Sequence, residues 1–458
     1  MLSIRNRIFK GGLVVAIGQI VGVFLSLIIQ HFLAVNISQS EVGIYFLLSS
    51  LTSLISLVIN LGMDRASVKL IAGELVNNNT ARASEFAKRF LITVFINAFI
   101  FIIFYLLFIN HYMVANLLAG LAVVPAILVA LWIALESLKC SMIEIFRGLQ
   151  KMTYVVALGT IVGRTIFALT LVGFSFFVIN IDIEGIVFIN CLITAFILIF
   201  GIVVLKNQLD FKVGLTAYSK ELYKIGPPIM GILVISVLNR EIDIWFVSFF
   251  MTEKDVAVYG AASRLVQFVT LSMIIVTSIL PPIISELYAT SKIDKLQNIM
   301  RGTTLICSLA SFIVVLIFLF FGDSIVRFIY TDEYQEAHLL MIILGVGKLL
   351  GVVAGSSGLI LMMASFQGLQ FKVLLVTFVI SASLSVVLIP YYGPVGAAVA
   401  SAFGMTLQNI VMTFYVYKKL GIKVHLFYSP IVMRNTLADG YQYLKQFIRK
   451  NRVSNEKI

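Results

Sequence analysis

The sequence predicts an all-α polytopic membrane protein with twelve transmembrane helices, in two six-helix lobes related by a pseudo-two-fold axis along the membrane normal. Its composition points to lipid as the solvent, because 60% of the residues are apolar, 12% are charged and the mean hydropathy is +1.03. Apolar runs repeatedly reach about 18 residues, enough for a helix to cross a bilayer core. Such continuous runs favour helices over strands of alternating polarity. A tandem repeat, given below, predicts the two lobes.

The apolar runs place the spans in order along the chain. The first run is longer than the apolar segment of a cleavable signal peptide, so we expect a retained span. Pro125 falls inside the fourth predicted span, where a proline would kink the helix. The predicted centres are Val23, Ser53, Ile100, Ile127, Thr165, Ala195, Ser236, Leu271, Ser311, Gly351, Ser381 and Met405.

Two segments between and after the spans read as membrane-surface structure. The run from Asp64 to Arg89 predicts a cytoplasmic surface helix and turn that touch anionic headgroups, with binding of a partner as the alternative. The basic tail after residue 420 is expected to lie against the inner leaflet.

A short loop occurs twice, which indicates an internal duplication. The stretch "ISQSEVGIY" begins at Ile37 and "MTEKDVAVY" begins at Met251, an offset of 214 (251 − 37). Hydroxyl, acid, Val and Tyr fall at equivalent places. Because each copy holds an even number of spans, both enter the membrane from the same side, and a normal axis relates them. We therefore predict an N-terminal lobe of residues 1–211, a C-terminal lobe of 212–420 and a tail of 421–458.

The net charge of +12 follows the membrane topology and does not indicate a nucleic-acid partner. With the N-terminus inside, only Lys254 and Arg327 of the 34 Lys and Arg fall on external loops, and four lie within spans. The remainder fall on cytoplasmic segments, as the positive-inside rule requires. Both termini are therefore expected in the cytoplasm.

The sequence lacks the residue patterns that several kinds of chemistry require. Cys140, Cys191 and Cys307 show no pairing pattern, and the four histidines lack metal-ligand spacing. There is no phosphate-binding loop of the GxxxxGK[ST] type, which argues against an ATP-driven pump within the chain. We expect no cofactor and no metal.

Several motifs make the chain similar to a known family. These are "SEVGIYFLLSSL", "NREIDIWFV", "AVYGAASRL", "PPIISEL" and "IPYYGPVGAAVASAFG". Over roughly residues 8–420 the chain resembles the O-antigen-type polysaccharide flippases of the multidrug/oligosaccharidyl-lipid/polysaccharide (MOP) exporter superfamily. The resemblance implies a transporter and not an enzyme. Its cargo would be a polyprenyl-pyrophosphate-linked oligosaccharide, moved from the cytoplasmic to the outer leaflet of the bacterial cytoplasmic (inner) membrane. It also implies a monomeric transport unit working beside membrane lipids and polysaccharide polymerase or chain-length proteins.

Ionisable residues within the spans are the candidate functional residues, because each is costly in hydrocarbon. The four cations are Arg164, Arg240, Arg264 and Lys348, and the two acids are Glu241 and Asp243. A lining with this excess of positive charge suits pyrophosphate, whose oxygens Arg binds bidentately. Arg164 has no acid three or four residues away and is the leading candidate.

Structural roles for the same residues stay open at this stage. Arg240 and Asp243 are three apart and could pair on one helix face. Arg264 could reach the interface, and Lys348 lies in a glycine-rich segment suited to close helix packing.

Transport against a gradient requires coupling, and H⁺ or Na⁺ are the expected ions. Asp243 lies on the face of Arg240, whereas Glu241 lacks that local partner and is the favoured switch. The alternatives to a flippase are a multidrug or cation antiporter of the same superfamily, and a non-transporting membrane scaffold in polysaccharide assembly. An antiporter for cations should line its cavity with acids. Nothing in the sequence identifies the glycan.

Overall fold

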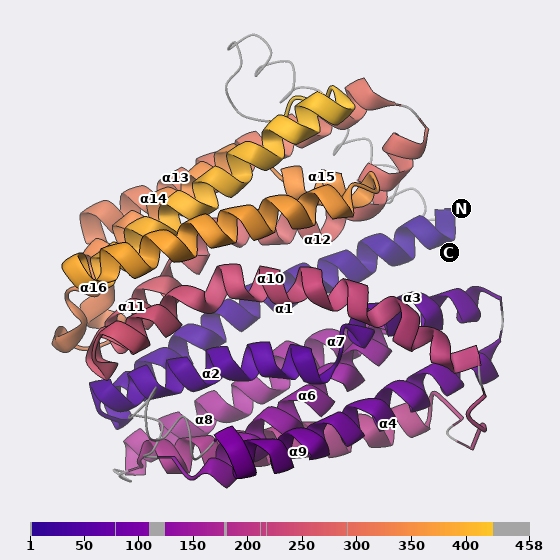
Figure 1. The fold of residues 1–458 in the computed structure, drawn as a ribbon, viewed down its shortest axis with the longest axis horizontal. Helices are drawn as coiled ribbons and strands as arrows, with labels where there is room; N and C mark the ends of the chain where they lie inside the picture. Colours follow the sequence, from indigo (N-terminus) through magenta and orange to yellow (C-terminus); the bar gives the residue numbers. More distant parts are fainter. Residues whose placement is uncertain are drawn as a thin grey trace, which may run out of the picture. The chain divides into compact units, whose positions relative to one another are not determined.

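The computed structural model describes residues 2–77, 79–109, 124–177, 181–210, 212–216, 218–290 and 292–424, and over these ranges the chain forms helices and short connections without a strand (Figure 1). This confirms the all-α prediction. In lipid a helix satisfies its backbone amide and carbonyl groups within one segment, which open strands do not.

The helices of the first half follow the predicted spans, except at the fourth. They are α1 (Leu2–Asn36), α2 (Gln39–Ile59), α3 (Met63–Val76), α4 (Thr80–Phe104) with a π-helical extension (Tyr105–Ile109), α6 (Ala126–Gly148), α7 (Met152–Val156), a π-helical turn (Ala157–Ile161), α8 (Val162–Phe177) and α9 (Ile183–Lys206).

The second half begins with a short 3₁₀ turn and contains the longest helices. Its elements are the 3₁₀ turn (Tyr218–Lys220), α10 (Glu221–Phe250), α11 (Glu253–Leu265), α12 (Gln267–Ala289), α13 (Ile293–Ile329), a 3₁₀ turn (Asp332–Tyr334), α14 (Ala337–Val353), α15 (Ser357–Met363) and α16 (Gln367–Leu420).

Eight helices in the described part of the chain are long and apolar enough to cross a membrane, or ten if two bent pairs each form one span. The bent pairs are α11 with α12 and α14 with α15. The count of twelve stays a prediction. It would follow if α10, which carries Arg240, Glu241 and Asp243, also spans and if α16 spans twice. The latter is physically reasonable because 54 helical residues extend about 81 Å, and Gly393, with φ of 58°, breaks α16 between Pro390 and Pro394.

Span four is displaced from its predicted position. Pro125 does not kink a span but stands directly before α6 as its N-cap residue, with φ of −53° and ψ of 127°. Proline is well tolerated at this end of a helix, where no intrahelical amide bond is lost. The centre of the fourth span therefore lies about ten residues after Ile127, and Glu136 and Lys139 come to lie inside it.

The segment predicted as a surface helix and turn is α3, a turn and the start of α4. With 14 residues, α3 is too short to span, and it packs on α4, α6 and α10. The turn before it passes through Gly62 at a φ of 66°, where a Cβ would lie 2.4 Å from the carbonyl oxygen of Gly226 on α10. The tail of residues 425–458, predicted to lie on the inner leaflet, is outside the described residues.

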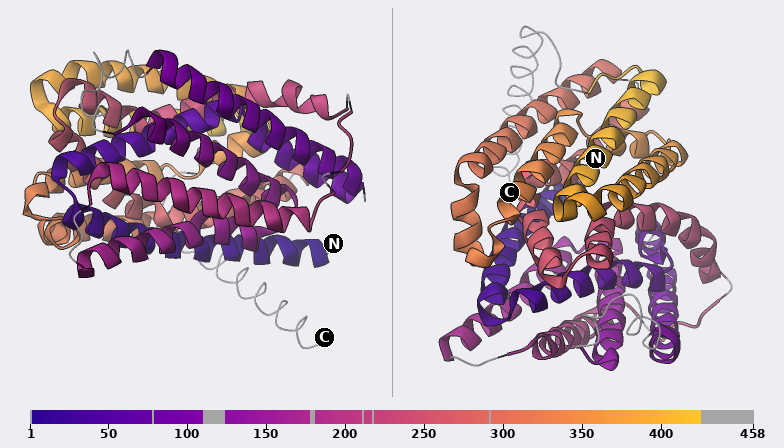
Figure 2. Two further views of the ribbon diagram at one scale, coloured as in Figure 1. Left: turned by 90° about the horizontal axis from the view of Figure 1, so that it is seen from below. Right: turned by 60° about the vertical axis from the view of Figure 1, so that its left-hand side comes forward.

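The helices form two compact units. Unit 1 contains residues 1–262, 323–340 and 382–398, and unit 2 contains 263–322, 341–381 and 399–458. In unit 1, α6 is central and packs against α2, α3, α4 and α9, while α10 packs against α2 and α3. Figure 2 shows the indigo-to-magenta helices of this unit running alongside one another. The predicted lobe boundary at 211 stays a prediction.

In unit 2, α14 is held by close helix contacts at two glycines. A Cβ on Gly347 would lie 2.6 Å from the Cα of Ala402 on α16. A Cβ on Gly345 would be in ordinary contact with Val269 and Val315, at 3.9 and 3.7 Å. Small residues thus bring α14 near α12, α13 and α16, as is common for helices in membranes.

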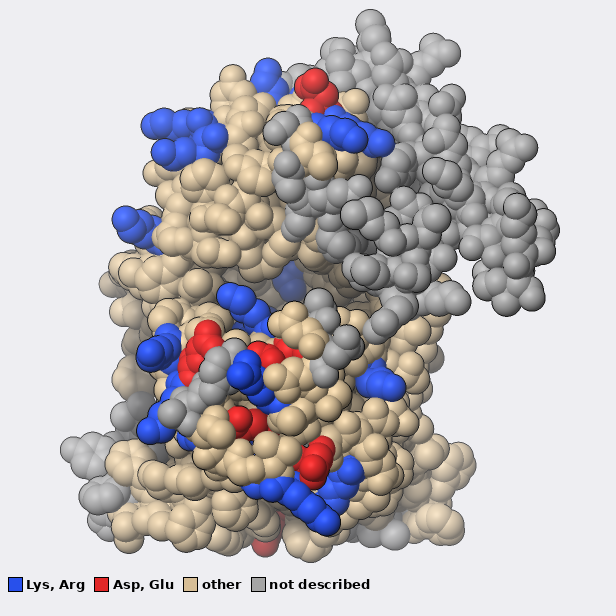
Figure 3. Space-filling model, turned by 90° about the vertical axis from the view of Figure 1, so that its right-hand side faces the viewer, with Lys and Arg blue, Asp and Glu red and all other residues tan. Residues whose placement is uncertain are grey.

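Charged side chains gather at the end of the molecule that Figure 3 faces, where α3 and the start of α10 lie in Figure 1. Exposed cations of unit 1 on the segments predicted as cytoplasmic are Arg65, Lys69, Arg82, Lys151, Lys206, Lys212, Lys220 and Lys224. The orientation itself, with this end in the cytoplasm, stays a prediction.

The connection between α9 and α10 is fastened to the first turns of α4. Lys88 donates to the carbonyl oxygen of Val213 (2.9 Å), and Arg89 donates to the carbonyl oxygen of Thr216 (2.8 Å) and to the hydroxyl of Ser219. The start of α10 is therefore positioned by the first half of the chain.

The repeated loops have a shared physical purpose, which is to start a helix. Ser38 accepts from the amide of Glu41, whose carboxylate accepts from the Ser38 amide at 2.9 Å. At the equivalent places Thr252 accepts from the amide of Asp255, whose carboxylate accepts from the Thr252 amide at 3.0 Å. Both are capping boxes, a hydroxyl followed three residues later by an acid.

Equivalent positions of the two loops also meet each other in space. A Cβ on Gly43 would lie 3.1 Å from the amide nitrogen of Ala257, its repeat partner (43 + 214 = 257), and 2.0 Å from the carbonyl oxygen of Glu253. A Cβ on Gly260 would lie 2.2 Å from the ring of Phe46, again its repeat partner (46 + 214 = 260). Contact between equivalent residues is what a two-fold axis between α2 and α11 produces, and for the lobes as a whole that axis stays a prediction.

We expect Gly43→Ala to destabilise the fold, because the new methyl group would overlap the Glu253 backbone. The free energy of unfolding should fall by about 2 kcal/mol, typical of overpacking. Gly173→Ala is the matched control, since a Cβ there meets nothing within 4 Å. Thermal unfolding in detergent measures both, and an unchanged Tm for Gly43→Ala would contradict the close packing.

Candidate functional site

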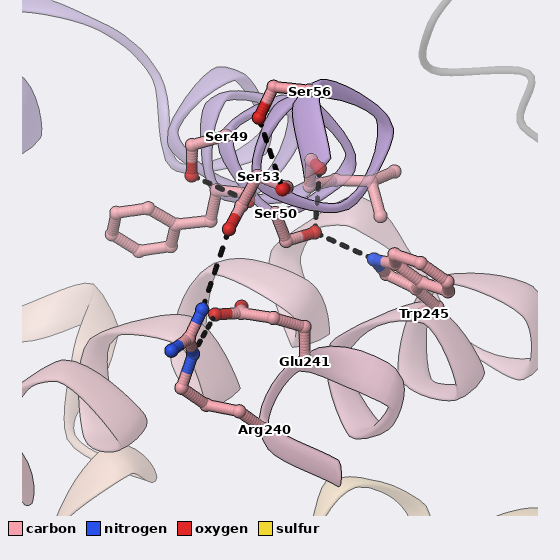
Figure 4. A network of polar contacts seen from close by, with 9 residues as sticks. Ser49, Ser50, Ser53, Ser56, Arg240, Glu241 and Trp245 are labelled. Atoms are coloured by element: carbon pink, nitrogen blue, oxygen red, sulfur yellow. Dashed lines mark hydrogen bonds and ion pairs between the residues drawn. The ribbon is translucent and has the colours of Figure 1, made fainter. Parts of the chain in front are cut away.

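The candidate site of unit 1 is centred on a charged turn in the middle of α10. Arg240 donates from Nε to Glu241 Oε1 at 2.8 Å, and its Nη2 lies 3.4 Å from Ser53 Oγ on α2 (Figure 4). Further along α10, Trp245 donates from Nε1 to Ser50 Oγ at 2.7 Å. The two helices are thus joined by polar contacts through one face of α2.

The guanidinium of Arg240 is the exposed cation of this site. Its side chain is 62% exposed and that of Glu241 is 25% exposed. An exposed guanidinium near the middle of an apolar helix is tolerated where it meets water or a polar ligand, not hydrocarbon. We infer that this face of α10 lines a polar space.

The ion pair corrects one expectation from the sequence. Glu241 was expected to lack a local partner, and that is wrong, because Arg240 pairs with it directly. Adjacent residues point in different directions from a helix, but the long Arg side chain folds back far enough to reach its neighbour. Asp243 is 4% exposed and lies on the buried side of α10.

Arg164 joins α8 to the first span. Its Nη1 donates to the carbonyl oxygen of Gly22 on α1 at 2.7 Å. Glycine is required there, because a Cβ at position 22 would lie 2.9 Å from Nη1 and 2.4 Å from the methyl group of Thr160. The π-helical turn Ala157–Ile161 directly precedes α8, a feature common near functional sites. The rest of the Arg164 side chain is exposed.

A second pair of intramembrane charges was missed by the sequence reading. Lys139 donates to Glu136 at 2.6 Å within α6, and their side chains are only 16% and 23% exposed. The Cys140 thiol lies 3.8 Å from the same carboxylate. With the fourth span centred at Ile127, the sequence places Glu136 and Lys139 on a cytoplasmic segment. Reading Pro125 as the start of a helix would have placed them inside the span.

Arg264 and Lys348 belong to unit 2. Arg264 is the penultimate residue of α11, beside the break where α11 and α12 meet at a bend of 42°. Lys348 follows Gly347 on α14. Both side chains are half-buried. Of the sequence-predicted site residues, the structure brings Arg240 and Glu241 into contact, and it places Arg164 on a different pair of helices of the same unit.

No group of three or more His, Cys, Asp or Glu residues in the described ranges is arranged to hold a metal ion.

Comparison with known proteins identifies the family. A family described as "Polysaccharide biosynthesis protein" matches residues 8–288, more than half of the chain. This protein belongs to that family. A relative with a similar sequence is the "Probable low-salt glycan biosynthesis flippase Agl15" of Haloferax volcanii, which is 22% identical over 423 residues, covering 91% of this chain and 84% of the relative.

Solved structures show which fold this polysaccharide biosynthesis protein has. An inward-facing multidrug resistance MATE transporter of the MOP superfamily matches with a TM-score of 0.74 and 13% identity, over 89% of this chain and 98% of that one. A MOP superfamily transporter from Pyrococcus furiosus, whose title reports reverse polarity of its binding pocket, matches with a TM-score of 0.68 and 14% identity, over 91% and 96%.

The expected polysaccharide family and the expected fold are therefore confirmed. The protein is a multi-pass membrane protein of the polysaccharide biosynthesis family, and its fold is that of solved MOP-superfamily transporters.

Because Glu136 and Lys139 are mostly buried, removing one partner should cost much more than removing both. We expect Lys139→Met to lower the free energy of unfolding by about 3 kcal/mol, since it leaves a buried carboxylate without its partner. The double variant Glu136→Gln/Lys139→Met should recover most of that loss, and Arg82→Met, at an exposed position, serves as the control. Thermal unfolding in detergent tests this, and equal losses in the single and double variants would refute the pair.

Proposed function

We propose that this protein is a flippase that moves a polyprenyl-pyrophosphate-linked oligosaccharide, an O-antigen or related surface polysaccharide unit, from the cytoplasmic to the outer leaflet of the bacterial inner membrane. The observation that carries the proposal is the exposed guanidinium of Arg240 at the centre of α10. The family description and the printed name of the Haloferax volcanii relative support a glycan cargo.

The proposed cargo matches the charges of the site. Pyrophosphate carries at least two negative charges, and guanidinium groups bind its oxygens in pairs. Arg240 and Arg164 supply such groups in unit 1, and Arg264 and Lys348 are the proposed cations of unit 2. The sugars would occupy the polar space that we infer along α10 while the polyprenyl chain stays in lipid. Rocking of the lobes would then expose the cargo to each side in turn.

A multidrug or cation antiporter is the second candidate, because solved transporters of this fold include multidrug exporters. An organic cation would require an acidic lining. The candidate residues instead comprise four cations and two acids, and one of those acids is already paired with Arg240. The charge balance therefore favours an anionic cargo.

The Arg240–Glu241 pair suggests how cargo binding and an ion gradient would be coupled. While Glu241 is ionised, it competes with pyrophosphate for the guanidinium. A proton or sodium ion on the carboxylate would weaken that competition and free Arg240 for cargo. Asp243 stays the second candidate for coupling. A monomeric transport unit beside polymerase or chain-length proteins stays an expectation.

We expect Arg164→Ala to abolish export of surface polysaccharide while lipid-linked units accumulate inside and the protein level in the membrane is maintained. Arg164→Lys should retain part of the activity, because the charge survives and the bidentate geometry is lost. Arg82→Ala is the control for loss of a cation elsewhere. Normal export by Arg164→Ala would remove this residue from the proposed site, and the same assay ranks Arg240, Arg264 and Lys348.

We expect Glu241→Gln to bind cargo and to lose most of its response to an imposed gradient, because the uncharged amide leaves Arg240 permanently available. Asp243→Asn should mainly reduce the amount of folded protein, because the side chain is buried. Export in vesicles with imposed proton or sodium gradients measures the response. An unchanged gradient dependence in Glu241→Gln would exclude it as the switch.

A further inference from the structure

A segment of the second half of the chain belongs to the same compact unit as the first half. Residues 323–340, the end of α13 and the connection to α14, belong to unit 1, although the chain on both sides of them belongs to unit 2. We call residues 323–340 the strap. Because its two ends continue directly into α13 and α14, any movement of unit 2 against unit 1 must pull on it.

Three hydrogen bonds attach the strap to the end of α1 and the start of α2. The Tyr330 hydroxyl donates to Gln30 Oε1, and His31 Nδ1 lies 3.0 Å from the carbonyl oxygen of Ile329, which requires a proton on that nitrogen. Gln39 donates from Nε2 to the carbonyl oxygen of Glu333 at 2.9 Å. The partners are about 300 residues apart in sequence, and two of these bonds use strap carbonyl groups.

Burial adds to these bonds. Tyr330 and Tyr334 are 2% and 1% exposed, and their rings pair with centroids 4.9 Å apart. Ala337 is fully buried and Leu340 is 2% exposed. An outer loop of a transporter would not need such burial merely to connect two helices.

Tyr334 distinguishes a permanent clamp from a releasable one. Its hydroxyl is buried and has no hydrogen-bond partner among the described residues, whereas that of Tyr330 is bonded. Burial also raises the pKa of Tyr334, so the phenol stays neutral. A buried hydroxyl without a partner is unfavourable, and water would satisfy it once the strap lifts. In the docked strap the hydrogen bond of Tyr330 therefore favours attachment, and the buried hydroxyl of Tyr334 favours release.

We propose that the strap is a latch that keeps the transport path shut at the external face, and that its release limits opening to the outside. The proposal rests on the flippase function and on the predicted topology, which places the ends of α1 and α13 outside. The neighbouring contact of Gly43 and Phe46 with α11, at the external start of α2, would close the same face.

Two matched variants test the latch, because each removes one hydroxyl and keeps the ring. Tyr330→Phe removes the bond to Gln30, so opening should increase about fivefold, as expected for one hydrogen bond. Tyr334→Phe removes the unfavourable hydroxyl, so opening should decrease by a similar factor. If Tyr→Phe changes only disturb packing, both variants should shift opening in the same direction.

Opening is measured without cargo, by labelling a cysteine introduced at Ser53 beside Arg240. The chain first has Cys140, Cys191 and Cys307 replaced by Ala, and intact cells are treated with a membrane-impermeant maleimide. Opposite changes of labelling rate in Tyr330→Phe and Tyr334→Phe support the latch. Equal or unchanged labelling rates overturn the latch. The flippase proposal is tested separately, by the export assay of Arg164 variants.

A cross-link provides the second measurement. Cysteines at Gln39 and Glu333 joined by a short bifunctional maleimide should reduce external labelling at position 53 to background. Cysteines at Asp323 and Arg327, which are one helical turn apart within the strap, are the control and should leave labelling unchanged. Full labelling in the cross-linked Gln39–Glu333 protein would overturn the proposal.

Discussion

Hydrocarbon solvates neither peptide groups nor charges, and most features of this protein follow from that constraint. The described chain satisfies its peptide groups by forming helices, whose backbone groups bond to one another. It accommodates charges in two ways. Glu136 and Lys139 neutralise each other within α6, while Arg240 keeps most of its side chain exposed and so marks a polar space. The same constraint that shapes the fold therefore marks the candidate functional residues.

The duplicated loop shows how few residues a repeat must keep. Ser38 with Glu41 and Thr252 with Asp255 differ in every letter, yet both form a capping box at the start of a helix. The helices they start then meet through small residues, Gly43 on one and Gly260 on the other. The candidate functional charges, in contrast, occur in one copy only among these equivalent positions. The repeat equivalents of Arg240 and Glu241 are Ser26 and Leu27, and Ser26 donates only to the carbonyl oxygen of Gly22.

The carbonyl oxygen of Gly22 accepts hydrogen bonds from both Ser26 and Arg164. Arg240 is held differently, because its guanidinium donates to the Glu241 carboxylate. In the proposed cargo site, Glu241 would therefore compete with an anionic cargo for Arg240.

The sequence by itself determined the solvent, the helical class and most span positions, because length and hydropathy act locally and need no knowledge of neighbours. It also found the intramembrane cations, since a charge in an apolar run is visible in one dimension. Only the tertiary structure decided their partners: a helical period placed Asp243 near Arg240, but a flexible side chain chose Glu241. The start of α6 at Pro125, and with it the burial of Glu136 and Lys139, likewise depended on local geometry that hydropathy averages away. The docking of residues 323–340 on α1 joins positions 300 apart, and no local pattern encodes such a contact.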